Sequence, residues 1–465
     1  MTLRTVATAA AVLVGVSGCT DTQGPGVRPV PIAEPAHSSS EAEGSRGPSP
    51  RQPLVLVTHM TAPNVRMDLR TARAVLGGAN RGWRVVAAPG VPVSGVRRVS
   101  SAPAAVRVVE RDPAALAVVP ASAVGPTVRA VLVDGVDPIR EPRRYSLTVA
   151  GPVPPSRPTT LGVVGDLMLT RGVLDAGRAL APLTPTLRGF DVTVGNLEST
   201  LSDNGSPQQG DDSFAAPRTV VRVLERGGFD AVSLANNHTG DYQDTALLET
   251  VRQLRQSSIE PFGAGPDLAA AGRPAILQAR GRSFGFVGFN SIGETPQATR
   301  ERPGVLSVRM PPRTGPLNPA DLRHVLRLVQ RLAQRVDCVV VIPHWGTQYT
   351  HLPEPVQRLV ARRLVAAGAD LVVGGHPHWV QGMDQVGRAV VAHSLGNFVF
   401  DMDFTTETQQ GVVLQATFWG STLKAVDLLP YRMDAGFAPR PAGAREGNAI
   451  LSDVWRTSTG PFRAR

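Results

Sequence analysis

The stretch Leu371-Val-Val-Gly-Gly-His-Pro-His378 joins a short apolar run to two histidines. Three consecutive apolar residues followed by two glycines predict a short buried strand over residues 371–373. The two histidines come directly after the glycines and are two positions apart, so on an extended segment both rings point to the same side. We therefore expect His376 and His378 to face one site at the carboxyl end of a strand.

Five further segments place a polar, metal-competent side chain at or just after the end of an apolar run. They carry Asp166 (Gly-Asp-Leu-Met-Leu, 165–169), Asn196 and Glu198 (Gly-Asn-Leu-Glu-Ser-Thr, 195–200), Asn236, Asn237 and His238 (Ala-Asn-Asn-His-Thr-Gly-Asp, 235–241), His344 (Pro-His-Trp-Gly, 343–346) and Asn397 (Ser-Leu-Gly-Asn-Phe, 394–398). In α/β sheets, ligands bind at the edge formed by the carboxyl ends of the strands. Each segment alone is compatible with a structural histidine or a turn, but their joint occurrence favours a metal site. Carboxylates, amides and imidazoles together suit Mn, Fe or Zn, so we expect one or two divalent metals.

Between residues 159 and 435, apolar strands alternate with amphipathic helices, which predicts an α/β domain whose sheet is covered on both faces. Helices are expected over 218–226, 244–256, 322–334 and 355–367. Strands are expected over 160–164, 192–195, 231–234, 284–289, 339–342, 371–373 and 390–393. Cys338 begins an apolar run and is interpreted as a buried strand thiol.

Three other segments have a different composition. Residues 53–150 predict a small α/β domain that weakly resembles part of a periplasmic solute-binding domain; a structural or docking module is an equal alternative. A proline-rich stretch, 152–158, ends it. Residues 436–465 are rich in Pro, Gly and Arg, and we expect a loose C-terminal tail.

The N-terminus is typical of a targeting segment. Residues 1–19 combine Arg4, a short apolar run and the sequence Val-Ser-Gly-Cys, which resembles a bacterial lipobox with Cys19 as the lipidated residue. An ordinary signal peptide is the alternative. Residues 20–52 are rich in Gly, Pro, Ser and Glu and predict a disordered linker. We therefore expect a lipid-anchored protein at the extracytoplasmic face of the cell membrane.

Composition narrows the class of partner. The chain has 465 residues, 42% of them hydrophobic, which excludes a wholly disordered protein. The net charge is +10, and Lys424 is the one lysine, so the positive charge is almost entirely arginine. Without a nucleic-acid-binding signature we interpret this as a solvated surface and expect no nucleic-acid partner. An anionic partner, such as an envelope polymer, fits the charge.

The series GDLML, NLEST, ANNHTGDY, HWG, GGHPHWVQG and SLGNFVF, in this order over residues 159–402, resembles the CapA family of poly-γ-glutamate capsule biosynthesis proteins. The resemblance implies a calcineurin-like metallophosphoesterase fold, a four-layer α/β sandwich with the metal site at one edge of its sheets. It also implies that His238 lies near the substrate. The metal ligands that it implies are Asp166, Glu198, Asn237, His344, His376 and His378.

Three departures from the superfamily pattern alter this expectation. Met168 stands where the first motif usually has a ligand histidine, Glu198 replaces a bridging aspartate, and Thr239 follows the Asn-His pair where an acid is usual. One metal subsite therefore lacks a nitrogen ligand. We expect one tightly and one weakly bound metal.

Further residues near these motifs are candidates for catalysis and substrate binding. Asp241 is expected to orient His238. Four candidates are expected to contact substrate: Arg171, Trp345, Asn196 and Asn397. The alternative for Arg171 is a surface charge, and the alternative for Trp345 is core packing.

Two functions follow from the resemblance and the candidate ligands. The first is a metal-dependent hydrolase, acting on a phosphoester or γ-glutamyl amide in the synthesis of capsule poly-γ-glutamate or another anionic envelope polymer. The second is a non-catalytic polymer-binding component of a synthesis or export complex. A solute-binding lipoprotein acting through residues 53–150 is a third hypothesis.

Overall fold

The computed structural model describes residues 49–63, 65–79 and 81–464. The predicted signal segment 1–19, Cys19 and nearly all of the predicted linker 20–52 lie outside this range. The end of the predicted linker is wrong, because a strand, β1, already begins at Arg51. Among the described helices, none has the length and apolar character needed to cross a bilayer.

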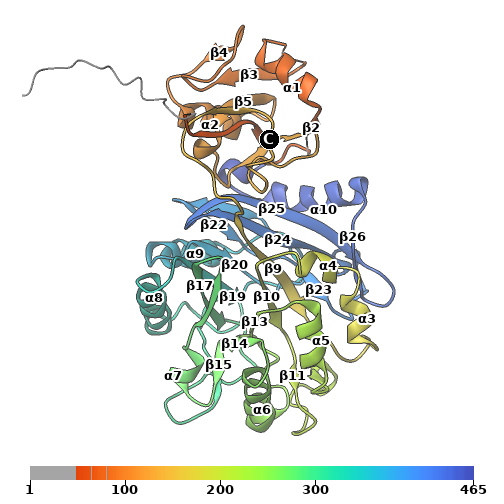
Figure 1. Cartoon of the computed structure of the whole chain (residues 1–465). Coiled ribbons are helices and arrows are strands. Elements are labelled where there is room, and N and C mark those ends of the chain that lie inside the picture. The colour runs from red at the N-terminus through yellow and green to blue at the C-terminus, as the bar shows by residue number, and fades with distance from the viewer. Residues whose placement is uncertain (1–48, 64, 80, 465) are drawn as a thin grey trace, which may run out of the picture. The chain divides into compact units, whose positions relative to one another are not determined.

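The first large sheet has eight strands (Figure 1). Its order is β14 (Glu260–Phe262), β13 (Ala231–Ser233), β10 (Val192–Leu197), β9 (Thr159–Leu167), β24 (Gln410–Trp419), β25 (Thr422–Met433) and β26 (Pro439–Pro441), and β23 (Asn397–Val399) also pairs with β9. The strands β9, β10, β13 and β14 are parallel, so their carboxyl ends meet at one edge. The hairpin of β24 and β25 adds antiparallel strands beside β9.

The second large sheet has six strands. Its order is β16 (Ala275–Ala279), β17 (Arg282–Asn290), β19 (Cys338–His344), β20 (Leu371–Val373), β22 (Ala389–Ala392) and β21 (Met383–Val386). The four central strands are parallel. All seven residues of β19 are buried, as expected of a near-continuous apolar run covered on both faces. Cys338 is buried as predicted.

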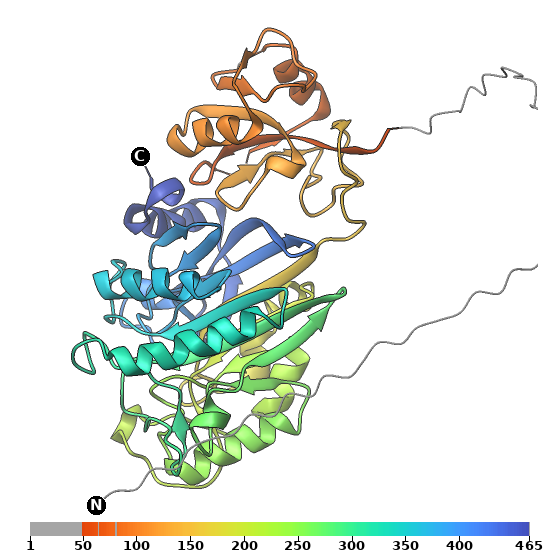
Figure 2. The ribbon, with the colours of Figure 1, turned by 90° about the vertical axis from the view of Figure 1, so that its left-hand side faces the viewer.

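The two sheets pack face to face, and helices cover their outer faces (Figures 1 and 2). One core lies between the sheets and includes Val163 of β9 and Val340 of β19. The helices α3 (Ala176–Leu180), α5 (Val220–Gly227) and α6 (Gln243–Arg255) cover the first sheet, and α8 (Pro319–Ala333) and α9 (Pro355–Ala366) cover the second. The predicted four-layer α/β sandwich is confirmed.

Residues 51–150 form a smaller mixed sheet with its own apolar core. Its order is β4 (Arg97–Arg98), β3 (Arg84–Ala87), β5 (Ala115–Pro120), β1 (Arg51–His59) and β6 (Val128–Ala130), and β8 (Thr148–Ala150) pairs with β1. Its helices are α1 (Leu69–Leu76) and α2 (Ala102–Arg111). Asp68 caps α1, accepting from the backbone nitrogen of Thr71 at 2.6 Å. Because residues 49–465 group as one unit, the boundary predicted between 150 and 159 stays a prediction.

Short elements complete the described chain. They are α4 (Thr184–Leu187), α7 (Leu268–Ala271) and the paired strands β2 (Arg66–Met67) with β7 (Leu132–Val133), β11 (Thr200–Leu201) with β12 (Ala215–Ala216), and β15 (Ala264–Gly265) with β18 (Gly304–Val305).

The C-terminal segment is ordered, so the predicted loose tail over 436–465 is wrong. Helix α10 (Ala444–Thr457) buries Ile450, Val454 and Trp455 in the core between the two large sheets, and Phe462 joins them. Ile450 and Val454 are one helical turn apart, which places them on the same face. The proline and glycine residues that suggested disorder lie mainly before and after this helix.

Candidate metal centre

The strand register brings the first polar side chains together at one edge of the first sheet. Asn196 of β10 and Asn397 of β23 are both paired with Asp166 of β9, each beside an irregularity in the ladder. Glu198 follows β10 by one residue, and Asn237 and His238 follow β13. The carboxyl ends of parallel strands therefore deliver the predicted residues to a common place.

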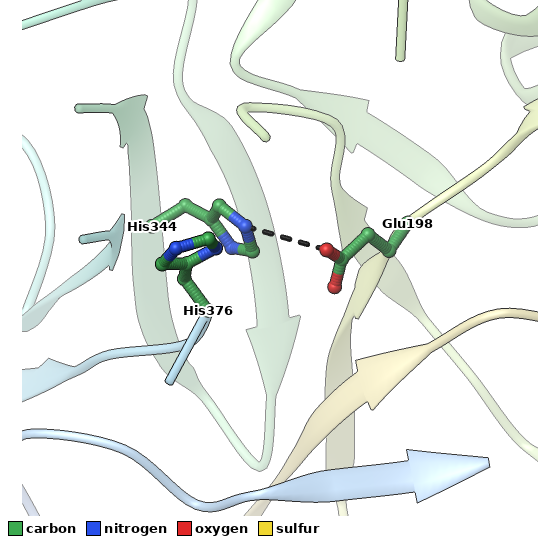
Figure 3. Close-up of side chains that lie close together, drawn as sticks. All are labelled: Glu198, His344 and His376. Atoms are coloured by element: carbon green, nitrogen blue, oxygen red, sulfur yellow. Dashed lines mark ion pairs between the residues drawn. The ribbon is translucent and has the colours of Figure 1, made fainter. Parts of the chain in front are cut away.

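A first group of potential ligands combines both sheets. Ligand atoms of Glu198, His344 and His376 all lie within 4.8 Å of one another (Figure 3). Figure 3 shows the Glu198 carboxylate facing the two imidazoles, and Glu198 Oε1 is 3.4 Å from His344 Nε2. Asn237 Oδ1 lies 2.8 Å from the same nitrogen. Four donors therefore converge on one small volume.

A second group shares Glu198 with the first. Ligand atoms of Asp166, Glu198 and His378 also lie within 4.8 Å of one another. His378 Nδ1 is 3.9 Å from Asp166 Oδ2 and 2.8 Å from Asn397 Oδ1. Met168 is fully buried in the apolar core and belongs to neither group, so this second group has three donors.

The buried polar atoms of the centre fit a divalent cation. Both ring nitrogens of His376 and Oε1 of Glu198 are buried without a hydrogen-bond partner among the described residues. Leaving such a group unsatisfied costs about 1–3 kcal/mol. A cation would take one ring nitrogen of His376 and Glu198 Oε1 together, and carboxylate, amide and imidazole donors match Mn, Fe or Zn. The residues present therefore fit one or two such metals.

Burial sets the protonation of the centre. It lowers the pKa of His344 to about 4 and lowers that of His376 well below the ordinary value. Both imidazoles are therefore neutral at pH 7, the form that binds metals. Burial, with the Asp166 charge second, raises the pKa of Glu198 to about 8. Burial therefore disfavours the ionised form of this carboxyl, and a nearby cation would favour that form and lower the pKa again.

The two histidines of the opening motif are not on an extended segment. His376 and His378 have φ values of 94° and 59°, so the expectation based on strand alternation is wrong. Their rings are nevertheless neighbours, with centroids 5.7 Å apart. A left-handed backbone is costly for residues other than glycine and is typical of functional sites. Gly375 permits this turn to approach Asp166, because a Cβ there would lie 2.4 Å from Asp166 Oδ1.

His238 is held beside the two groups. Its Nδ1 lies 2.8 Å from Asp241 Oδ2, and its Nε2 lies 3.8 Å from Glu198 Oε1. Burial lowers the pKa of His238, but the hydrogen bond to Asp241 and the Glu198 charge raise it further than burial lowers it. The His238 side chain is 10% exposed, more than His344 or His378, so it is the histidine of this cluster that solvent reaches.

Two residues that sequence reasoning missed complete the support of His238. The ring of Phe214 stacks on the imidazole at 4.0 Å between centroids, and its backbone nitrogen donates to Asp241 Oδ2 at 2.7 Å. Gln209 donates to Asp241 Oδ1. Both residues lie in an irregular segment with no motif or periodicity, and nothing in the sequence pointed to them.

Three of the four predicted substrate contacts are buried and contact other residues. Trp345 is fully buried in the core behind the second sheet and donates to the carbonyl of His393, so it does not line the site. Asn196 donates to Asp166 Oδ1 at 2.8 Å, and Asn397 lies against His378. The two asparagines therefore orient ligands instead of facing substrate.

Arg171 has its charge paired within the protein. Its guanidinium contacts both carboxylate oxygens of Asp401, at 2.9 Å and 2.6 Å. It also lies over the ring of Phe214, 4.5 Å from the ring centroid. The structure gives Arg171 a part in holding Phe214, and its predicted contact with substrate stays a prediction.

Two facing sheets with outer helices, and a cluster of carboxylate, amide and imidazole groups at their carboxyl edge, define a four-layer α/β sandwich with a candidate metal centre. The family described as bacterial capsule synthesis protein PGA_cap matches residues 160–402, more than half of the chain. The chain therefore belongs to this family, the CapA family that the sequence motifs indicated.

Named relatives agree with this assignment. The capsule biosynthesis protein CapA of Bacillus anthracis is 29% identical over 313 residues, which cover 64% of this chain and 74% of the relative. The PGA biosynthesis protein CapA of Bacillus subtilis is 30% identical over 260 residues, covering 54% and 65%. A probable polyglutamine synthesis accessory protein of Mycobacterium tuberculosis is 30% identical over 240 residues, covering 49% and 60%.

Solved structures share less sequence. A putative 5′-nucleotidase from Staphylococcus aureus, in complex with alpha-ketoglutarate, is 15% identical with a TM-score of 0.38, covering 64% of this chain and 58% of that chain. A hypothetical protein from Thermus thermophilus is 17% identical with a TM-score of 0.39, covering 59% and 99%.

Proposed function

We propose that this protein is a metal-dependent hydrolase that acts on a phosphoester or γ-glutamyl amide during synthesis of capsule poly-γ-glutamate or a related anionic envelope polymer. The observation that carries the proposal is the buried Glu198, which belongs to both ligand groups and lies next to the solvent-reached His238. The identity of the polymer is taken from the family, a bacterial capsule synthesis family, and from its capsule biosynthesis and polyglutamine synthesis relatives.

The four-donor group of Glu198, Asn237, His344 and His376 would hold the tighter metal. The three-donor group of Asp166, Glu198 and His378 would hold the weaker one. A bound divalent metal supplies Lewis-acid polarisation of the substrate oxygen and lowers the pKa of water. Manganese, iron and zinc are the candidates.

His238 is the residue with the geometry for proton transfer. Asp241 holds Nδ1, so Nε2 is the ring nitrogen directed toward the ligand groups. The raised pKa keeps this imidazole protonated to a higher pH than usual, which suits donation of a proton to a leaving oxygen or nitrogen. Phe214, which itself contacts Arg171, covers one face of the ring, and Asp241 restricts the rotation of the ring.

The alternative, a non-catalytic polymer-binding component, is favoured by one observation. Met168 supplies no ligand atom, so the second ligand group has three donors, one fewer than the first group and one fewer than a closed structural site uses. Bound polymer without turnover under any metal would support this alternative.

The deciding experiment measures bound metal and hydrolysis on the same purified protein. Wild type, His376→Ala and His324→Ala are compared, since His324 is a histidine of α8 outside both ligand groups. Each is assayed with a phosphodiester and with γ-linked glutamate oligomers. We expect metal and turnover to fall together in His376→Ala and to remain in His324→Ala. Equal turnover in His376→Ala and wild type would refute the proposal.

We also propose that the protein is anchored by a lipid on Cys19 at the extracytoplasmic face of the membrane, where it could join a capsule synthesis complex. The support is the pattern of residues 1–19. Cys19→Ser should release the protein from the membrane fraction into the soluble fraction. Retention of this variant in the membrane fraction would contradict the lipid anchor.

A further inference from the structure

The loop that follows β19 holds a large aromatic residue in a strained conformation. Tyr349 has a φ of 60°, the left-handed region that bulky residues rarely adopt. Its backbone nitrogen donates to the carbonyl of Pro377, between the two histidines of the metal centre, at 2.9 Å. Strain of this kind costs about 1–3 kcal/mol, persists where the surrounding structure holds the residue in place, and is concentrated at active sites and ligand clamps.

The Tyr349 ring lies directly beside the ligand groups. It stacks on His378 with centroids 5.9 Å apart and an interplanar angle of 26°. Its edge meets Phe404 at 5.2 Å and 87°. Tyr349 is 38% exposed and Phe404 is 60% exposed, so two large aromatic side chains face solvent next to a buried cluster of ligands. We call this pair the aromatic corner.

The Tyr349 hydroxyl is available for a ligand. No hydrogen bond joins it to another residue in the described part of the chain, whereas Tyr145 and Tyr431 each donate to a backbone carbonyl. The aromatic corner therefore combines apolar ring surface with one free neutral donor. The nearby Arg171 charge is already paired with Asp401, so it does not supply this donor.

We propose that the aromatic corner binds the polymer strand as it enters the metal centre, with the ring faces covering methylene groups and the Tyr349 hydroxyl donating to a carboxylate of the strand. This inference rests on the proposed function and deepens it. The perpendicular arrangement of the rings favours a narrow, flexible chain over a flat base, because a flat base needs two parallel faces to stack between. One face of Tyr349 is also already covered by His378.

The test measures binding of a γ-linked glutamate hexamer to the metal-loaded full-length chain by calorimetry. Tyr349→Asn removes the ring and suits the left-handed backbone, Phe404→Ala removes the exposed partner, and Tyr349→Phe removes the hydroxyl alone. Leu352→Ala is the matched control, since Leu352 is exposed in the same loop. We expect Kd to rise at least about tenfold in the first two variants and about threefold in Tyr349→Phe, as for one lost hydrogen bond. Leu352→Ala should not change Kd.

The outcomes separate this inference from the proposed function. A wild type that binds no hexamer refutes this inference, and the proposed function is then decided by the turnover assay with the phosphodiester. A wild type that binds, with the same Kd in Tyr349→Asn and Phe404→Ala, refutes this inference alone. Loss of bound metal in Tyr349→Asn would assign the ring to structural support of His378 and would also refute it. If Tyr349→Asn and Phe404→Ala weaken the binding of adenosine monophosphate but not that of the hexamer, the aromatic corner binds nucleotides and the proposal is wrong.

Discussion

Replacing Glu198 by glutamine should stabilise the metal-free protein and at the same time abolish most of its response to metal. The side chain is fully buried and belongs to both ligand groups. Its Oε1 has no hydrogen-bond partner among the described residues, and burial raises its pKa to about 8. Glutamine keeps the shape and removes the ionisable group, so the two effects have opposite signs.

The magnitude follows from the pKa of Glu198. At pH 7 the unfolded chain ionises this carboxyl, whose ordinary pKa is 4.5, while the folded chain keeps it mostly protonated. At about 1.4 kcal/mol for each pH unit between those values, the difference disfavours folding by about 3 kcal/mol. This penalty is absent below pH 4.5 and grows as the pH rises toward 8. The stabilisation by Glu198→Gln should follow the same course.

With metal present, the difference in stability between the variant and wild type should shrink, because wild type gains more from the metal. A ligand at about 100 times its Kd stabilises the folded state by about 2.7 kcal/mol. Wild type should show this gain, and the variant, which lacks the shared carboxylate, should gain less than about 1 kcal/mol. The assay is urea unfolding with and without Mn²⁺ or Zn²⁺ at pH 5, 7 and 8.

Glu249→Gln is the matched control. Glu249 is also buried, but it accepts hydrogen bonds from Ser202 at 2.5 Å and Asn204 at 2.8 Å, which lower its pKa. Its replacement should destabilise the protein at pH 7 by roughly 1–2 kcal/mol and leave the metal response unchanged. A metal-free Glu198→Gln protein that is less stable than wild type at pH 7, or one that still responds fully to metal, would refute the reasoning.

Three further predictions follow. Metal affinity should rise with pH up to about 8, because metal binding must displace the proton of Glu198. Calorimetry in buffers of different ionisation heat should detect the released proton. A metal affinity that is independent of pH between 6 and 8 would contradict this prediction. Asp241→Asn should lower turnover by about 10²-fold without loss of bound metal, since the partner that orients His238 is altered, and an unchanged rate would remove His238 from the mechanism. Trp455→Ala should cost about 3–5 kcal/mol in urea unfolding, and a cost near zero would show that α10 is dispensable.

The ligand positions could be predicted because they follow a simple local pattern. Asp166, Glu198 and His344 each stand at or just beyond the end of an apolar run, and parallel strands bring such positions to one edge. The predicted strands differ from the observed ones only at their ends, because the apolar runs that predict them are also local in sequence.

Other features depended on properties that the local pattern does not encode. The positive φ of His376 arises from the close approach of its turn to Asp166, which is a contact distant in sequence. Trp345 follows a ligand but is directed into the core, because its indole finds the carbonyl of His393 there. Helix α10 was missed because the composition of its flanks outweighed the helical spacing of Ile450 and Val454. The support of His238 by Phe214 could not be predicted either, since no periodicity marks a residue in an irregular segment.

Because one carboxylate belongs to both ligand groups, two cations bound there would not load independently. The first ion to bind would displace the proton of Glu198 to solvent and fix the side chain, and the second would then meet a carboxylate already in place. Thermodynamic linkage makes this influence reciprocal: whatever the first ion does to the affinity of the second, the second does equally to the first. If the weaker-bound ion is scarce, the affinity of the centre for the tighter-bound ion would therefore fall as well. The two subsites would then fill and empty together as the supply of metal changes.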